Sequence, residues 1–238
     1  MGADRLASVR AAAARRAHPL AALGLAGALL IGAAASGGGC AVGRTARATA
    51  GVPSLPRGAL AVPLVRQATR YSCGAAALLA VLYYWRVYDG NESELWPALH
   101  TTERDGTEPA PMVALARAHG LTADYRTDVT VDELRAALAA GQTVIVDLQA
   151  WQEQPRPWAS DWDDGHYVVL VALDAHALYA MDPSVGAGYA RLPLEQLAAR
   201  WHDVEAVDHQ ERQRQHLAIF VSGAAHLSAV PAPLTEMR

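Results

Sequence analysis

The feature that most constrains this chain is an almost wholly apolar segment from Cys73 to Arg86. After the cysteine it reads Gly-Ala-Ala-Ala-Leu-Leu-Ala-Val-Leu-Tyr-Tyr-Trp. A helix that is apolar on every side has no face to expose to water, so the rest of the fold must enclose it. The chain has the side chains for such a core, since 52% of its residues are hydrophobic and 18% charged. We therefore expect a buried central helix in one well-packed domain.

The segments around this helix predict an α+β fold, with N-terminal helices and the buried helix packed on an antiparallel sheet. The pattern predicts a short extended segment at 61–67, helices at 91–99, 109–119, 131–140 and 193–201, and strands at 121–126, 143–148, 166–173, 176–181 and 217–222. Polar residues 202–214 are expected to form a loop.

The N-terminus has the order of an export signal, with four arginines before an apolar run from Pro19 to Ser36 and small residues after it. We divide the chain into a signal peptide at 1–40, a linker at 41–60, the folded domain at 61–222 and a loose C-terminal tail at 223–238. The protein is thus expected to be exported, and to be periplasmic or membrane-anchored.

Three fates of this N-terminus stay open. The small residues that end in Cys40 resemble a lipoprotein cleavage box, although Gly37 replaces its usual leucine. Cleavage after Ala50 would release a soluble protein. A retained anchor is the third, because the apolar run nearly reaches the ~20 residues of a membrane span.

Net charge and the spacing of the histidines limit which kinds of ligand we expect. Without residues 1–40 the chain keeps 16 arginines against 23 acidic residues, a net charge of −7. Such a domain has no electrostatic reason to bind nucleic acid. His202, His209 and His216 have no metal-ligand spacing and are interpreted as surface residues. We expect no metal and no cofactor.

Cys73 stands at the predicted start of the buried helix, before Gly74 and three alanines. A thiol there meets the positive end of the helix dipole and free backbone N–H groups, which favour the thiolate. Taken alone, the same pattern fits an inert cysteine on an apolar helix.

His166 opens one apolar strand, and Asp182 follows the next one. Folding both strands about Asp174-Ala175 places 166 opposite 183, or opposite 182 if the register differs by one residue. Opposed side chains have Cβ atoms about 5 Å apart, within reach of a carboxylate that orients an imidazole. The imidazole can then take the proton of a cysteine and return it to a leaving amine. Gln67, six residues before Cys73, has an amide N–H₂ that can hold an oxyanion.

At these residues the chain resembles the C39 family of peptidases, a papain-like group that processes bacteriocin leaders. The resemblance lies in Gln-Ala-Thr-Arg-Tyr-Ser-Cys-Gly-Ala-Ala-Ala-Leu at 67–78, Gly-His-Tyr-Val-Val-Leu at 165–170 and Asp-Pro-Ser at 182–184, and spans residues 61–222. It implies Cys73 as nucleophile, His166 as general base and acid, Asp182 as orienting carboxylate and Gln67 as oxyanion donor.

The resemblance also implies a substrate class. Family members often cleave after a Gly-Gly pair in a leader peptide, and many are fused to an ABC exporter. This chain is too short for that fusion and has no Walker-type loop, so it resembles a free-standing exported member. The expected partners are a peptide or protein substrate and components of an export system.

Two departures bear on the substrate. Many members carry an acidic residue before the cysteine, where this chain has Ser72. The tryptophan-rich loop at 151–164 looks expanded, and it fits either a wall of the substrate cleft or a satellite hydrophobic cluster.

The main functional hypothesis is a cysteine peptidase that acts in the cell envelope. Two alternatives keep the fold. One is an amide transferase or deamidase that uses the same acyl-enzyme, and the other is a binding lipoprotein without catalysis. Substrate identity, cleavage site and oligomeric state do not follow from the sequence.

Overall fold

The computed structural model describes residues 54–186, 188–207, 210–228 and 234–237. The predicted signal peptide, lipidation at Cys40, cleavage after Ala50 and most of the linker at 41–60 lie outside these residues. Within the described ranges, no helix has the length and hydrophobicity that a membrane crossing requires.

Helix α2 (Cys73–Tyr84) is the buried helix expected from the apolar segment, with residues 74–82 all buried. Two helices pack beside it, α3 (Glu92–Leu99) and α4 (Pro109–Ala118). Two more follow later in the chain, α5 (Val131–Ala139) and α6 (Leu194–Arg200), with a 3₁₀ turn at Trp158–Ser160. Gly120 and Gly141 follow α4 and α5 with positive φ angles of 81° and 75°, which glycine adopts without strain.

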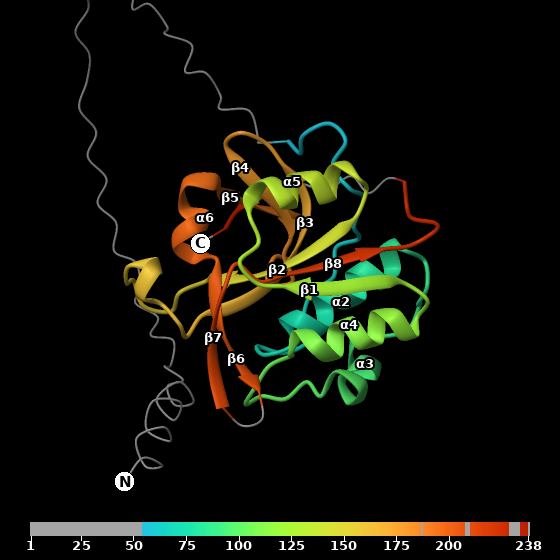
Figure 1. Cartoon of the computed structure of the whole chain (residues 1–238), viewed down its shortest axis with the longest axis horizontal. Coiled ribbons are helices and arrows are strands. Elements are labelled where there is room, and N and C mark those ends of the chain that lie inside the picture. The colour runs from blue at the N-terminus through green and yellow to red at the C-terminus, as the bar shows by residue number, and fades with distance from the viewer. Residues whose placement is uncertain (1–53, 187, 208–209, 229–233, 238) are drawn as a thin grey trace, which may run out of the picture. The chain divides into compact units, whose positions relative to one another are not determined.

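The main sheet has the strand order β1-β8-β2-β3-β4-β5-β9. All pairings are antiparallel except β5 with β9. Its strands are β1 (Thr122–Arg126), β2 (Thr143–Gln149), β3 (Gly165–Leu173), β4 (Ala177–Met181), β5 (Tyr189–Pro193), β8 (Ala218–Ser222) and β9 (Leu234–Glu236). The expected α+β architecture is therefore confirmed (Figure 1).

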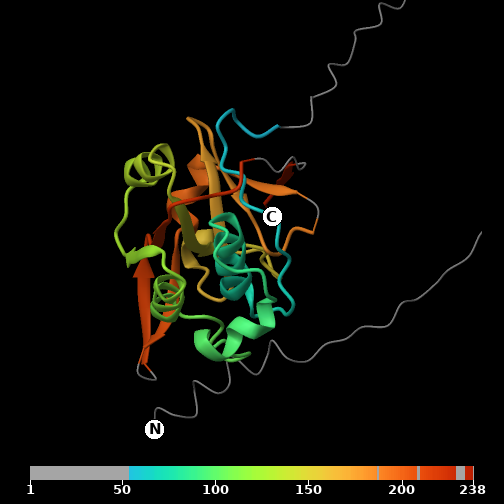
Figure 2. The ribbon, with the colours of Figure 1, turned by 90° about the vertical axis from the view of Figure 1, so that its right-hand side faces the viewer.

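The sheet separates two apolar cores because successive strand residues point to opposite faces. On β2 and β3, Ile145 and Val169 belong to the core under α2, whereas Val146 and Leu170 belong to the core under α5 and α6. Helices therefore cover both faces (Figure 2). Central strand β2 is buried along its full length.

Three expectations about segments outside the main elements were wrong. Residues 202–214 form most of a two-stranded ribbon, β6 (His202–Val207) with β7 (Gln210–Gln215), and not a loop. The tail at 223–238 is not loose throughout, since it contributes β9 to the sheet and Met237 is buried. The end of the linker also joins the domain, because the Leu60 N–H donates to the Val171 carbonyl at 2.8 Å.

Candidate active site

Cys73 is the first residue of α2, and its thiol is free and half-buried. The first N–H groups of a helix have no partner within it, so they face the thiol together with the positive end of the helix dipole. Ser72, directly before it, is fully buried, and its Oγ accepts a hydrogen bond from the Thr69 N–H at 3.1 Å. An acidic side chain at this position would be enclosed, which accounts physically for the serine.

Gly74 lets the start of α2 approach the sheet closely. A Cβ at this position would lie 2.7 Å from the Cβ of Thr107 and 3.1 Å from Cδ2 of Tyr167. The first contact is shorter than real Cβ atoms tolerate, so a larger residue would push the helix away. The glycine thus lets the start of α2 lie close to Thr107, which precedes α4, and to Tyr167 of β3, the residue after His166.

The predicted register of the β3–β4 hairpin was wrong. Strand β3 ends at Leu173 and β4 begins at Ala177. Val169 pairs with Met181, and the register shifts between Leu170 and Ala172. Residue 166 is therefore opposite neither 182 nor 183. Asp182 directly follows the last strand residue, and its side chain still reaches the imidazole of His166.

The imidazole of His166 and the carboxylate of Asp182 form a buried hydrogen bond. Nε2 of His166 lies 2.7 Å from Oδ1 of Asp182, and both side chains are at least nine-tenths buried. Burial alone lowers the pKa of His166. The charge and hydrogen bond of Asp182, followed by interactions with Cys73, outweigh it and raise the pKa to about 10. Because Asp182 occupies Nε2, Nδ1 is the ring nitrogen left for the thiol.

Gln67 lies beside the residues that follow Asp182. Its backbone N–H donates to the Pro183 carbonyl at 3.0 Å, and its Oε1 accepts from the Ser184 hydroxyl at 3.2 Å. Its Nε2 donates to the Thr69 carbonyl at 2.7 Å. An amide nitrogen carries two N–H groups, so one of them stays available for a substrate oxygen.

Two carboxyl groups interact with each other near Cys73, and the sequence analysis did not predict this pair. Asp147 of β2 pairs with Tyr167 in the register of β2 and β3, and its side chain interacts with Asp203 of β6. Burial, then the charge of Asp203 and then that of Cys73, raise the pKa of Asp147 well above its usual value. Burial also raises the pKa of Asp203, to about 6. The one feature of the sequence that pointed to this pair is the carboxylate of Asp147 inside the otherwise apolar strand predicted at 143–148.

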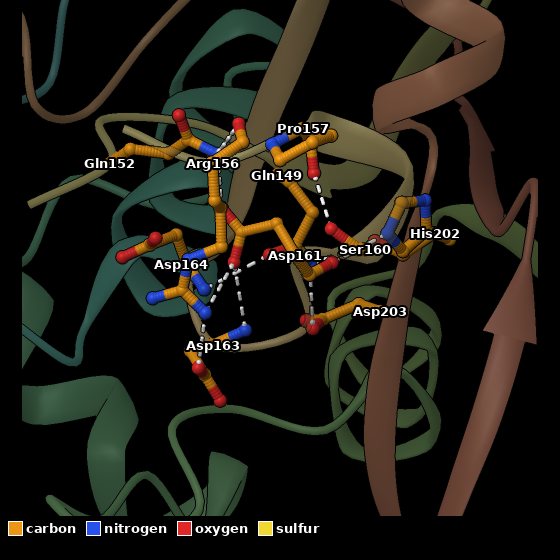
Figure 3. A network of polar contacts seen from close by, with 10 residues as sticks. All are labelled: Gln149, Gln152, Arg156, Pro157, Ser160, Asp161, Asp163, Asp164, His202 and Asp203. Atoms are coloured by element: carbon orange, nitrogen blue, oxygen red, sulfur yellow. Dashed lines mark hydrogen bonds and ion pairs between the residues drawn. The ribbon is translucent and has the colours of Figure 1, made fainter. Parts of the chain in front are cut away.

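The tryptophan-rich loop is tied to the body of the domain by polar contacts (Figure 3). Its ends meet where the Ala150 N–H donates to the Asp164 carbonyl at 3.0 Å. Inside it, Asp161 is fully buried and accepts from the Gln152 amide at 2.6 Å. The Trp158 ring lies 3.8 Å from the Arg200 guanidinium carbon. For residues 158–162 these contacts favour a cluster packed against the domain over a wall of the substrate cleft.

One histidine interpreted as a surface residue is buried. His202 is 3% exposed because its Nε2 lies 2.6 Å from the Asp161 carbonyl oxygen and its ring packs 4.3 Å from that of Trp162. His216 is half-buried against Trp201, and His209 lies outside the described residues. Among the described residues, no group of three or more His, Cys, Asp or Glu side chains is placed to hold a metal ion.

Comparison with known proteins agrees with this fold. Residues 59–209 match the family described as the Peptidase_C39 like family. The match spans more than half of the chain, so the protein belongs to this family. No curated protein matches the chain.

One solved structure shows the same fold. A protein described as a C39-like peptidase from Bacillus anthracis aligns with a TM-score of 0.51 and 18% identity, over 69% of this chain and 96% of that one. Two others align with lower TM-scores. A double glycine motif protease from an AMS/PCAT transporter, in complex with its leader peptide, gives 0.47 at 20% identity, over 71% of this chain and 98% of that one. The peptidase domain of Streptococcus ComA gives 0.45 at 19% identity, over 68% and 99%.

Proposed function

We propose that this protein is a cysteine peptidase that cleaves a peptide or protein substrate, with Cys73 as its nucleophile. The observation that carries the proposal is the buried 2.7 Å contact of His166 with Asp182, beside a half-buried thiol at the start of α2. A buried imidazole with a pKa of about 10 stays protonated at neutral pH and can stabilise a thiolate as its counterion. Membership of a peptidase-like family supports the same chemistry.

The proposed reaction has two halves. Cys73 reacts as the thiolate of a thiolate–imidazolium pair with His166, and its sulfur bonds to the carbonyl carbon of the scissile peptide. The Cys73 N–H and the free Gln67 amide N–H hold the oxyanion, and loss of one such donor costs about 3 kcal/mol. The C–N bond then breaks as His166 protonates the leaving amine. Water, which gives a proton to the now neutral His166, attacks the thioester, releases the carboxylic acid and restores the thiolate–imidazolium pair.

We place this activity in the cell envelope and take a Gly-Gly leader as the first substrate to test. The cellular site rests on the basic and apolar order of residues 1–40, and the substrate rests on the family resemblance. The same acyl-enzyme would give a transferase if an amine replaced water, so a mass spectrum of products formed with an added amine separates these two reactions.

The test measures the reaction of Cys73 with iodoacetamide in the full chain between pH 5 and 9. Tryptic peptides report the two cysteines separately, because Cys73 falls in 71–86 and Cys40 in 17–44. We expect alkylation of Cys73 below pH 7, cleavage of a Gly-Gly peptide, and loss of cleavage in Cys73→Ala. A folded protein whose Cys73 stays unreactive across this range would overturn the proposal.

A further inference from the structure

Both oxygens of the Asp182 carboxylate have donors, and the two sets differ. Oδ1 faces Nε2 of His166 at 2.7 Å and accepts from the Ser184 N–H at 2.8 Å. Oδ2 accepts from the indole N–H of Trp151 at 3.0 Å. The side chain of Asp182 is fully buried, so a carboxylate that lost one of these donors would have to turn or remain unsatisfied.

Trp151 is held in a conformation that non-glycine residues seldom adopt. It directly follows the buried residue Ala150 and has a φ angle of +61°. A left-handed conformation is unfavourable for a residue that bears a side chain, so the surrounding structure must fix it. Two backbone contacts do so on its N-terminal side: the Ala150 N–H donates to Asp164, and Arg200 Nε donates to the Gln149 carbonyl at 2.8 Å.

The position of Trp151 links the loop to the proposed catalytic pair. The loop begins at Trp151, whose side chain contacts Asp182, and it ends two residues before His166. The other tryptophans of the loop have different partners: Trp158 lies over Arg200, and Trp162 packs against His202. Trp151 is thus the member of this loop whose N–H bonds to the carboxylate.

We propose that Trp151 is a positioning residue, whose indole N–H fixes the Asp182 carboxylate in the orientation that presents Oδ1 to His166. This inference rests on the proposed function. Without the N–H, the buried Oδ2 turns toward another donor and the contact with Nε2 is lost for part of the time. The imidazolium then has a weaker partner, and the thiolate of Cys73 forms at higher pH. In the described part of the chain, the charged groups that interact with Asp182 are His166 and the buried guanidinium of Arg200.

The experiment compares Trp151→Phe with Trp162→Phe in the full chain. Each variant keeps an aromatic ring and removes one N–H from the same loop. We measure the rate of iodoacetamide alkylation of Cys73 between pH 4 and 9 by mass spectrometry of the tryptic peptide 71–86. We expect Trp151→Phe to move the midpoint of the profile up by about one pH unit, which lowers the rate about tenfold at any pH well below both midpoints. Trp162→Phe should follow the wild type.

A midpoint for Trp151→Phe that matches Trp162→Phe, or that moves to lower pH, overturns the inference. If Trp151→Phe does not fold, L-3-benzothienylalanine at position 151 replaces the N–H by sulfur and keeps the bicyclic ring, and the same shift is expected. Alkylation needs no substrate, so the two proposals fail differently. An unreactive wild-type Cys73 removes the proposed function, whereas a reactive one with an unchanged variant profile removes only the role of Trp151.

Discussion

Asp182 and Asp147 are both buried aspartates that adjoin the proposed nucleophile and base, yet their surroundings are opposite. Asp182 accepts hydrogen bonds at both oxygens and lies beside an imidazolium and a guanidinium. Asp147 lies beside a second carboxyl, and its Oδ1 has no hydrogen-bond partner in the part of the chain that the structure describes. Burial of an ionised carboxylate requires donors and a counter-charge, and Asp182 has both. Burial and the charge of Asp203 raise the pKa of Asp147 well above its usual value, so Asp147 keeps its proton to higher pH.

This difference matters for a thiolate. Asp147 interacts electrostatically with Cys73, and Tyr167, its neighbour across β2 and β3, packs against Gly74. An ionised Asp147 would oppose a negative charge on sulfur, whereas a protonated one does not. The two aspartates thus act in the same direction: one sustains the positive imidazolium, and the other keeps negative charge away from the thiolate.

Replacing each aspartate by asparagine should separate the two roles, with the largest effect at Asp182. Asp182→Asn keeps the shape but removes the charge that holds His166 protonated. We expect the alkylation rate of Cys73 at pH 6 to fall about 100-fold, within the usual contribution of a proton-transfer pair.

Asp147→Asn is the matched control, because the raised pKa of Asp147 favours the neutral carboxyl, and asparagine is neutral too. Its alkylation rate should stay within about threefold of the wild type, given the scatter of effects on neighbouring residues. Equal losses in both variants would contradict the contrast between the two carboxyls.

The same contrast predicts two pH windows in which stability falls. A group whose pKa is raised by folding keeps its proton longer in the folded state, so the free energy of unfolding decreases as pH rises from the unfolded to the folded value. For Asp203 this window runs from about pH 4 to about 6. For His166 it runs from about 6.5 to about 10, with a change on the order of a few kcal/mol.

Urea unfolding followed by circular dichroism at pH 4.5, 6.5 and 9.5 checks both windows. Asp203→Asn should reduce the decline between the first two pH values without abolishing it, because the pKa values of Asp147 and Asp164 are also raised, and it should leave the contribution of His166 to the second decline intact. His166→Gln should do the reverse. A stability that rises from pH 6.5 to 9.5 in the wild type would show that the imidazole is not held protonated by folding.

The sequence predicted those parts of the molecule that rest on apolar periodicity and on short spacings. The buried helix and the hairpin strands follow from runs of apolar residues, and their ends brought His166 and Asp182 near each other. The register was not predictable, because a shift inside an evenly apolar strand changes no pattern. Strand β7 was missed since its residues, Gln-Glu-Arg-Gln-Arg-Gln, are all polar and lack alternation.

Contacts between distant segments were also out of reach. The bond from Trp151 to Asp182 joins residues 31 positions apart, and no local signal selects this tryptophan from the three in the loop. The pairing of Asp147 with Asp203 depends on β6 folding back over Gly165, where a Cβ would collide with the Asp203 carboxylate. Tertiary structure brings these side chains together, so their contacts cannot be predicted before the arrangement of the strands is known.

The smallest predicted effect tests whether lost reactivity simply reflects lost stability. Thr130 caps α5 on the face of the sheet opposite α2: its Oγ1 accepts from the Glu133 N–H at 3.2 Å, and the Glu133 carboxylate accepts from the Thr130 N–H at 2.8 Å. Thr130→Ala should lower the free energy of unfolding by about 1 kcal/mol, measured by urea unfolding, without moving the alkylation profile of Cys73. If this remote change shifted the profile as Trp151→Phe does, reactivity would follow global stability, and the specific roles of Asp182 and Asp147 would lose their support.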